Sequence, residues 1–155
     1  ETYKIPGRNV RITEFSALLG RIQLKKLDEY LSQRRQIANI YKSELSDVNN
    51  IEHLFPDDMN SSAFWKVPII LDSKINRVKL TNELKLNGIN IDWAYNPPLH
   101  LQPVFIDLYN TYEGQLPITE DCLKRHICLP CHPRMNDEDA YFVAEKIKDF
   151  ISRVN

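Results

Sequence analysis

The sequence predicts an α+β fold in which a small antiparallel sheet is covered by helices on one face. Three observations support this: a long helical stretch begins near the N-terminus, short β-type runs occupy the middle of the chain, and an amphipathic helix closes it. The predicted order is two helices, a strand, a helix, a strand, a loop, a short helix, a strand and a closing helix, and no Gly/Ser-rich linker divides the chain. We therefore expect residues 1–155 to form one α+β domain.

The helical stretch begins after Thr13, a residue type favoured at helix N-caps. Apolar residues then recur at spacings of three and four, first up to Ile22 and again between Leu27 and Leu45. This pattern predicts either one long amphipathic helix or two helices joined near residues 23–26. A stripe of this length needs another element on which to pack.

The middle of the chain predicts two strands and a helix between them. Residues 63–71 are rich in aromatic and branched side chains, and Pro68 indicates an edge strand or a bulge. Apolar residues at 78–86 predict a short helix that Asn87-Gly88 ends. Residues 89–93 alternate as a half-buried strand does.

The last third predicts a loop, a helix, a strand and a closing helix. Paired prolines exclude regular structure from residues 96–100. Pro117 opens a short helix that extends to His126, and residues 127–129 form a brief strand. Asn136, followed by three acidic residues, begins the closing amphipathic helix.

Composition excludes several classes of protein. The chain has 20 Lys+Arg against 21 Asp+Glu, so its net charge of −1 gives no electrostatic basis for binding nucleic acid or an anionic membrane. Its mean hydropathy is −0.42, and its longest apolar run, residues 67–71, is too short to cross a bilayer. Three cysteines and no visible signal peptide predict a cytoplasmic protein without a disulfide framework.

One local motif has the spacing of a metal or haem site. Cys128-Leu129-Pro130-Cys131-His132 matches a c-type haem attachment sequence and also half of a zinc site. Haem attachment requires an exported protein, and a zinc site requires a fourth ligand from elsewhere in the chain. We therefore predict no metal site and expect Cys128 to be a small buried residue of a strand.

Two loops are better candidates for ligand binding. Residues 95–103 place Tyr95, Asn96 and His100 on a stiff proline-rich turn, although the residues alone favour a His100 that caps a helix or satisfies a buried carbonyl. Residues 7–14 precede a helix N-terminus and carry Arg8, Asn9 and Arg11, which suit an anionic ligand. A solvated turn with arginine paired to Glu14 is the alternative for the second loop.

Short motifs distributed along nearly the whole chain resemble a known family when they are taken together and in order. They are Gly7-x-Asn9-x-Arg11-x-Thr13-Glu14, Ala17-x-x-Gly20-x-x-Gln23-Leu24, Arg34 with Ala38 and Tyr41, Gly88-Ile89, Tyr95-x-x-Pro98-Leu99-His100, Leu116-Pro117-x-Thr119-Glu120 and Leu129-Pro130-x-His132-Pro133. From about Gly7 to the closing helix, the chain is similar to the C-terminal part of the DegT–StrS group of aminotransferases.

The resemblance implies a fold, a cofactor and a set of site residues. In this family of fold-type I enzymes, a small C-terminal domain packs on a large domain that binds pyridoxal phosphate (PLP), and the homodimer acts on nucleotide-linked keto sugars. Asn9 would reach the cofactor phosphate of the neighbouring subunit, and Arg11 would lie on the sugar-nucleotide side. Tyr95 and His100 would belong to a loop that approaches the substrate.

The chain also departs from the family pattern. Ala94 occupies a position where a histidine is common, which predicts a different substrate contact or a different sugar; Val10 and Ile12 replace an aromatic residue and a methionine. The catalytic lysine lies upstream of the Gly7–Arg11 motif in this family, so the resemblance implies no catalytic residue in this chain.

Two functions follow as expectations. In the first, the chain is the C-terminal domain of an enzyme that transfers an amino group, usually from glutamate, to a nucleotide-linked keto sugar for polysaccharide or antibiotic synthesis, and it is inactive alone. In the second, the same fold is a stand-alone interaction or regulatory module without enzymatic activity.

Overall fold

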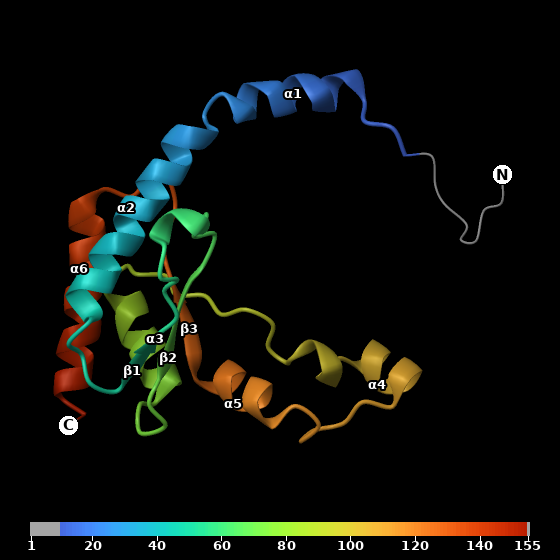
Figure 1. Cartoon of the computed structure of the whole chain (residues 1–155). Helices are drawn as coiled ribbons and strands as arrows, with labels where there is room; N and C mark the ends of the chain where they lie inside the picture. The colour runs from blue at the N-terminus through green and yellow to red at the C-terminus, as the bar shows by residue number, and fades with distance from the viewer. Residues whose placement is uncertain (1–9, 155) are drawn as a thin grey trace.

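A computed structural model describes residues 10–154 of the chain (Figure 1). Its helices and strands follow one another in this order: α1 (Glu14–Leu24), α2 (Leu27–Leu45), β1 (Ile51–His53), the 3-10 helix η1 (Met59–Ser61), β2 (Val67–Leu71), α3 (Arg77–Leu86), the 3-10 helix η2 (Leu99–Leu101), α4 (Pro103–Tyr109), α5 (Pro117–Arg125), β3 (His126–Leu129) and α6 (Asp137–Ser152). The predicted α+β class with a small antiparallel sheet is confirmed.

The three strands form an antiparallel sheet in the order β1-β2-β3. Ile69 of β2 lies opposite His53 of β1 and Ile127 of β3. Pro68 was expected at an edge or a bulge, but it lies in the central strand. The sheet tolerates proline here because β1 ends opposite Ile69, so Pro68 has a partner only in β3. The amide hydrogen that proline lacks therefore leaves no acceptor of β1 without a donor.

The core lies where α2, α3 and α6 pack together and against the sheet (Figure 1). Side chains from each of these elements are fully or almost fully buried there, including Tyr41, Ile69, Leu80, Ile127 and Ile147. Burial of large apolar side chains of this kind contributes roughly 1.5–3 kcal/mol each, so this region supplies most of the stability of the chain.

The predicted ends of three helices are confirmed. Asn136 caps α6 through a reciprocal capping box with Asp139. Asn87 ends α3, and Gly88 follows it at a φ of +77°, a conformation that glycine adopts without strain. At the other end of the chain, the Thr13 side chain accepts a hydrogen bond from the Ser16 amide and caps α1.

Other boundaries differ from the sequence prediction. The strand expected at residues 63–71 begins at Val67, and Phe64, with a φ of +44°, lies in the irregular segment before it. The strand expected at 89–93 is reduced to one bridge between Asp92 and Cys128. Strand β1 and helix α4 were not predicted.

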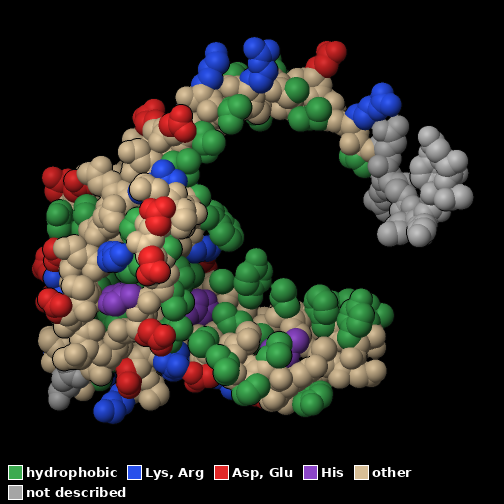
Figure 2. All heavy atoms as spheres, viewed as in Figure 1, with side chains coloured by type: hydrophobic (Ala, Val, Ile, Leu, Met, Phe, Trp, Pro, Cys, Tyr) green, Lys and Arg blue, Asp and Glu red, His purple; other side chains and the backbone are tan. Residues whose placement is uncertain are grey.

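Two parts of the molecule extend away from the core. Helix α1 projects from the N-terminal end of α2, and none of its residues is buried. Residues 95–125, which we call the lobe, carry η2, α4 and α5 on the opposite side of an open space (Figure 1). Figure 2 shows hydrophobic side chains on the faces of α1 and of the lobe that border this space. No helix among residues 10–154 is long and apolar enough to cross a bilayer.

Candidate functional site

The lobe contains an apolar pocket of about 500 Å³ beside the predicted substrate loop. The pocket is lined by Tyr95, Leu99, His100, Phe105, Tyr109, Thr111, Leu116 and Thr119. Phe105 and Tyr109 stack on one another at a centroid separation of 5.9 Å and form an aromatic wall from α4. A pocket with mostly apolar walls and a few hydroxyl groups suits an organic ligand rather than an ion.

Tyr95 presents its phenol at this pocket from a strained backbone. Its φ is +48°, which is uncommon for a residue with a side chain, and its side chain is largely exposed at 61%. The backbone is anchored on both sides of it: the Ala94 amide donates to Nε2 of His126 at 2.8 Å, and Gln102 Nε2 donates to the Pro97 carbonyl at 3.0 Å. Strain of this kind is maintained when the surroundings fix the conformation, and it concentrates at functional sites.

A buried polar pair forms the floor of the lobe. Nε2 of His100 lies 2.9 Å from Oε1 of Glu120, and both side chains are nearly inaccessible. The Glu120 carboxylate also accepts hydrogen bonds from the Gly114 and Leu116 amides, and the Thr111 hydroxyl donates to the His100 carbonyl. The bond from His100, assisted by the two amides, lowers the pKa of Glu120. Glu120 thus joins the two loops that flank α4.

Of the three predicted substrate residues, the structure brings two together at one pocket and places the third, Arg11, elsewhere. Tyr95 and His100 line the same pocket, although His100 directs Nε2 at Glu120 rather than at solvent. Arg11 is exposed in the segment before α1 and does not line this pocket. Asn9, the predicted contact of the cofactor phosphate, lies outside the described residues.

The cysteine motif is incorporated in the core. Cys128 is buried in β3, and burial raises the pKa of its thiol. Cys131 donates to the Arg34 carbonyl at an S···O distance of 3.5 Å, and burial raises its pKa to about 11. Among residues 10–154, no three His, Cys, Asp or Glu side chains come together as a metal site would require. Both thiols are therefore poor nucleophiles and serve packing.

The described residues do not by themselves fit a PLP site. No lysine lines the apolar pocket, and the three partly buried lysines, Lys66, Lys146 and Lys148, are each paired with a carboxylate. A lysine that holds PLP needs a neutral amine beside the cofactor, and these paired ammonium groups do not provide one. We therefore derive no chemical step through a cofactor in this part of the chain.

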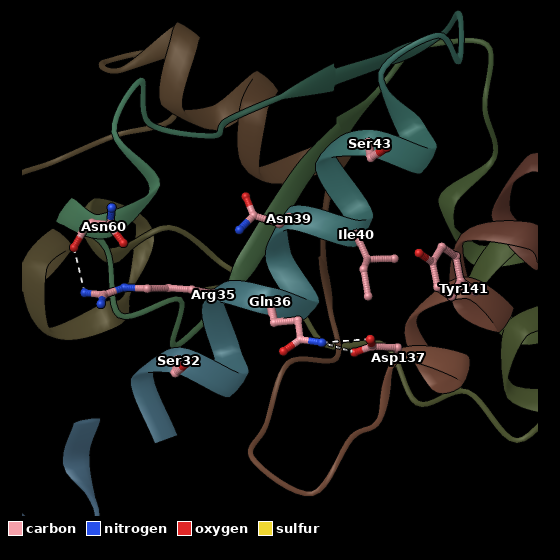
Figure 3. Close-up of a pocket in the computed structure, with 9 residues that line it drawn as sticks. All are labelled: Ser32, Arg35, Gln36, Asn39, Ile40, Ser43, Asn60, Asp137 and Tyr141. Carbon is pink, nitrogen blue, oxygen red and sulfur yellow. Dashed lines mark hydrogen bonds between the residues drawn. The ribbon is translucent and has the colours of Figure 1, made fainter. Parts of the chain in front are cut away.

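A second hollow, of about 520 Å³, lies between α2, η1 and the start of α6 (Figure 3). Its polar groups connect the three elements: Gln36 Nε2 donates to both carboxylate oxygens of Asp137 at 2.7 Å, and Arg35 Nη2 donates to the Asn60 carbonyl at 2.6 Å. Figure 3 shows both connections at the rim of the hollow. We interpret it as a structural junction.

Sequence reasoning missed two residues of the site. Glu120 belongs to one of the family-like motifs but was given no role, and His126 was considered only as the end of a helix and as a possible fourth ligand of a zinc site. Glu120 could have been identified from its position: it is a carboxylate in the first turn of α5, shortly after Leu116-Pro117. A carboxylate there can accept hydrogen bonds from the amides of the preceding loop. No local pattern indicated that the His126 ring binds the Ala94 amide, because the two residues are 32 positions apart.

Comparison with known proteins gives this site a context. Residues 1–148 match the DegT/DnrJ/EryC1/StrS aminotransferase family. The chain is 29% identical over 150 residues to GDP-perosamine synthase of Escherichia coli O157:H7, covering 97% of this chain and 39% of that protein. It is 30% identical over 145 residues to dTDP-4-dehydro-2,3,6-trideoxy-D-glucose 4-aminotransferase of Saccharopolyspora spinosa, covering 92% of this chain and 35% of that protein.

Solved structures agree in fold. The aminotransferase PseC of Helicobacter pylori, involved in the biosynthesis of pseudoaminic acid, superposes with a TM-score of 0.82 at 26% identity, over 98% of this chain and 41% of that one. The aminotransferase TlmJ of Streptoalloteichus hindustanus superposes with a TM-score of 0.81 at 25% identity, over 99% and 40%. The chain thus spans about two fifths of the length of these proteins.

Proposed function

The chain belongs to the DegT/DnrJ/EryC1/StrS aminotransferase family, and we propose that it forms the C-terminal domain of a sugar aminotransferase. The complete enzyme would transfer an amino group from glutamate to a nucleotide-linked keto sugar. The observation that carries this proposal is the family match, which extends over residues 1–148, while the relatives are about two and a half times as long. The names of two relatives specify GDP- and dTDP-linked sugars.

Within that enzyme, we assign the lobe to substrate binding. Tyr95 offers an exposed hydroxyl that can donate to or accept from a sugar hydroxyl, and the apolar walls beside it exclude water from the bound group. His100 contributes to the pocket wall while Glu120 fixes its ring. Arg11 would meet the negative charge of the nucleotide diphosphate, for which a guanidinium is well suited. The role of Asn9 toward the cofactor phosphate stays a prediction.

The uncovered apolar faces fit the same arrangement. Helix α1 exposes Phe15, Leu18, Leu19 and Ile22, and the lobe exposes several aromatic side chains. Figure 2 shows hydrophobic side chains on the faces of both that border the open space. A soluble chain rarely leaves such large patches uncovered, so we propose that a PLP-binding domain, which carries the catalytic lysine, packs against these faces. We propose further that the enzyme is a cytoplasmic homodimer. PLP, when bound, supplies the electron-withdrawing ring that makes amino transfer possible.

The activity is tested with the full-length enzyme that contains this chain. Supplied with PLP, glutamate and GDP-, dTDP- or UDP-linked 4-keto sugars, it should convert one of them to an amino sugar that mass spectrometry detects. The 155-residue chain alone should produce none. Folded full-length protein that converts none of these sugars would contradict the proposal and favour the non-enzymatic module.

The substrate role of Tyr95 has its own test in the same assay. Tyr95→Phe removes one hydrogen bond to the sugar, so the KM for the keto sugar should rise about fivefold to tenfold while PLP retention is unchanged. Tyr112→Phe is the matched control, since Tyr112 is exposed in the lobe but does not line the pocket. An unchanged KM in Tyr95→Phe would remove Tyr95 from the substrate site.

A further inference from the structure

The residues just before Tyr95 pair with β3 at one position only, through the bridge between Asp92 and Cys128. Asp92 and Cys128 exchange backbone hydrogen bonds, with N···O distances of 2.7 Å from the Cys128 amide and 3.4 Å from the Asp92 amide. In an antiparallel ladder, the next pair of this type lies two residues further along each strand, at Ala94 and His126. Continued pairing there would extend the sheet and carry Tyr95 onward as a strand residue.

Both backbone groups that such pairing requires are already in use at His126. Its amide donates to the Cys122 carbonyl and completes the C-terminal cap of α5. Its carbonyl accepts from Nη1 of Arg77 at 3.3 Å, and the same guanidinium donates to the Leu123 carbonyl at 2.9 Å. The Ala94 amide does not donate to the His126 carbonyl but to the side chain of the same residue.

The imidazole of His126 replaces that acceptor. Nε2 accepts the Ala94 amide at 2.8 Å, and Nδ1 lies 3.0 Å from the Leu123 carbonyl. A carbonyl only accepts, so Nδ1 carries the proton and Nε2 carries the lone pair. The two contacts thus require one neutral tautomer. The residue that follows Ala94 is Tyr95, at its φ of +48°.

We propose that His126 is the positioning residue of the substrate loop: its ring ends the pairing with β3 and directs the chain into the conformation that presents Tyr95. This inference rests on the proposed substrate role of Tyr95. His126 itself does not line the pocket and acts only through the backbone of residues 94 and 95.

The surroundings keep the ring neutral. His126 is buried, and the desolvation of its charged form lowers its pKa. Arg77 of α3 lowers the pKa further, whereas Asp92 and the carbonyls of Leu123 and Cys122 oppose this effect. Lys66, Cys122 and Cys128 are the other titratable residues that line the small apolar cavity beside the ring. Protonation would place an N–H against the Ala94 N–H and break the anchor.

The unmodified chain gives the first test. Long-range ¹H–¹⁵N spectra of the 155-residue protein at neutral pH distinguish the tautomers of each histidine. We expect His126 to be protonated at Nδ1 and unprotonated at Nε2. A ring protonated at Nε2, or at both nitrogens, would overturn the proposal because it could not accept the Ala94 amide.

Two substitutions separate the two contacts of the ring. His126→Gln places an amide oxygen near the position of Nε2, and His126→Asn places an amide nitrogen near that of Nδ1. Hydrogen exchange of the Ala94 amide should stay close to wild type in His126→Gln and accelerate roughly fivefold to tenfold in His126→Asn. The Ile69 amide, in the centre of the sheet, reports whether each variant is folded.

Equal acceleration in both variants, or none in His126→Asn, would show that the ring serves packing alone. The substrate role of Tyr95 is judged separately by the KM of Tyr95→Phe. If the KM of Tyr95→Phe is normal but the Ala94 amide exchanges as predicted, His126 still anchors the loop, and the loop has a function other than binding the sugar. The two hypotheses therefore fail in different experiments.

Discussion

Helices α1 and α6 both present an apolar stripe at helical spacing and both begin with a side-chain cap, yet their environments are opposite. Six residues of α6 are buried, whereas no residue of α1 is. Helix α4 of the lobe is exposed in the same way as α1, because none of its residues is buried. The difference shows that an apolar stripe predicts a packing partner but does not say whether that partner belongs to the same fold.

The strongest test of this contrast shortens one isoleucine in each helix. Ile147→Ala in α6 removes a fully buried side chain and should lower the free energy of unfolding by about 2–5 kcal/mol. Ile22→Ala in α1, where the side chain is 46% exposed, should change it by less than about 0.5 kcal/mol. Urea unfolding followed by circular dichroism measures both. Comparable losses would mean that α1 is packed in solution.

A smaller effect is expected from one hydroxyl in the core. Tyr41 is fully buried and donates to the Pro130 carbonyl at 2.9 Å, so Tyr41→Phe should cost about 1–3 kcal/mol by leaving that carbonyl unpaired. Tyr109→Phe, on the exposed face of α4, is the matched control and should cost almost nothing.

The same tyrosine gives a pH dependence. Burial raises the pKa of Tyr41 above its ordinary value of 10.0, so the folded state binds its proton more tightly than the unfolded state does. This contribution to stability is complete below pH 10 and decreases as the pH rises further. The difference in unfolding free energy between wild type and Tyr41→Phe should shrink at alkaline pH, and a constant difference would contradict the assignment.

The smallest global effect is expected in the lobe. Glu120→Gln weakens the contacts to His100 and to the Gly114 and Leu116 amides, so exchange of those two amides should accelerate while the urea midpoint hardly moves. The lowered pKa of Glu120 means that its charged form stabilises the folded lobe above pH 4.5 and is lost as the pH falls. A large shift of the midpoint would show that lobe and core unfold together.

The core was largely predictable from the sequence because its signals are local. Asn136 with its acidic first turn marked the start of α6, and Asn87-Gly88 marked the end of α3. Strand β1 was missed because three residues are too short to show alternation. Helix α4 was missed because the prolines before it suggested a loop, although Pro103 occupies the first helical turn, where proline is tolerated.

The site was predictable only in part, because its geometry depends on contacts between distant residues. The proline-rich loop identified Tyr95 and His100, and the structure places both at one pocket. The roles of Glu120 and His126 arise from partners 20 and 32 positions away, which no short window contains. The strain at Tyr95 likewise has no signal in its residue type.

The bridge between Asp92 and Cys128 closes the base of the entire lobe, together with the bond from Ala94 to His126. The lobe therefore begins and ends at β3, so its two ends lie next to one another. Doubling the length of such a closed excursion costs only about 0.6 kcal/mol of chain entropy. The lobe can therefore gain, lose or exchange residues over evolutionary time at little cost in stability, while the sheet beneath it stays the same.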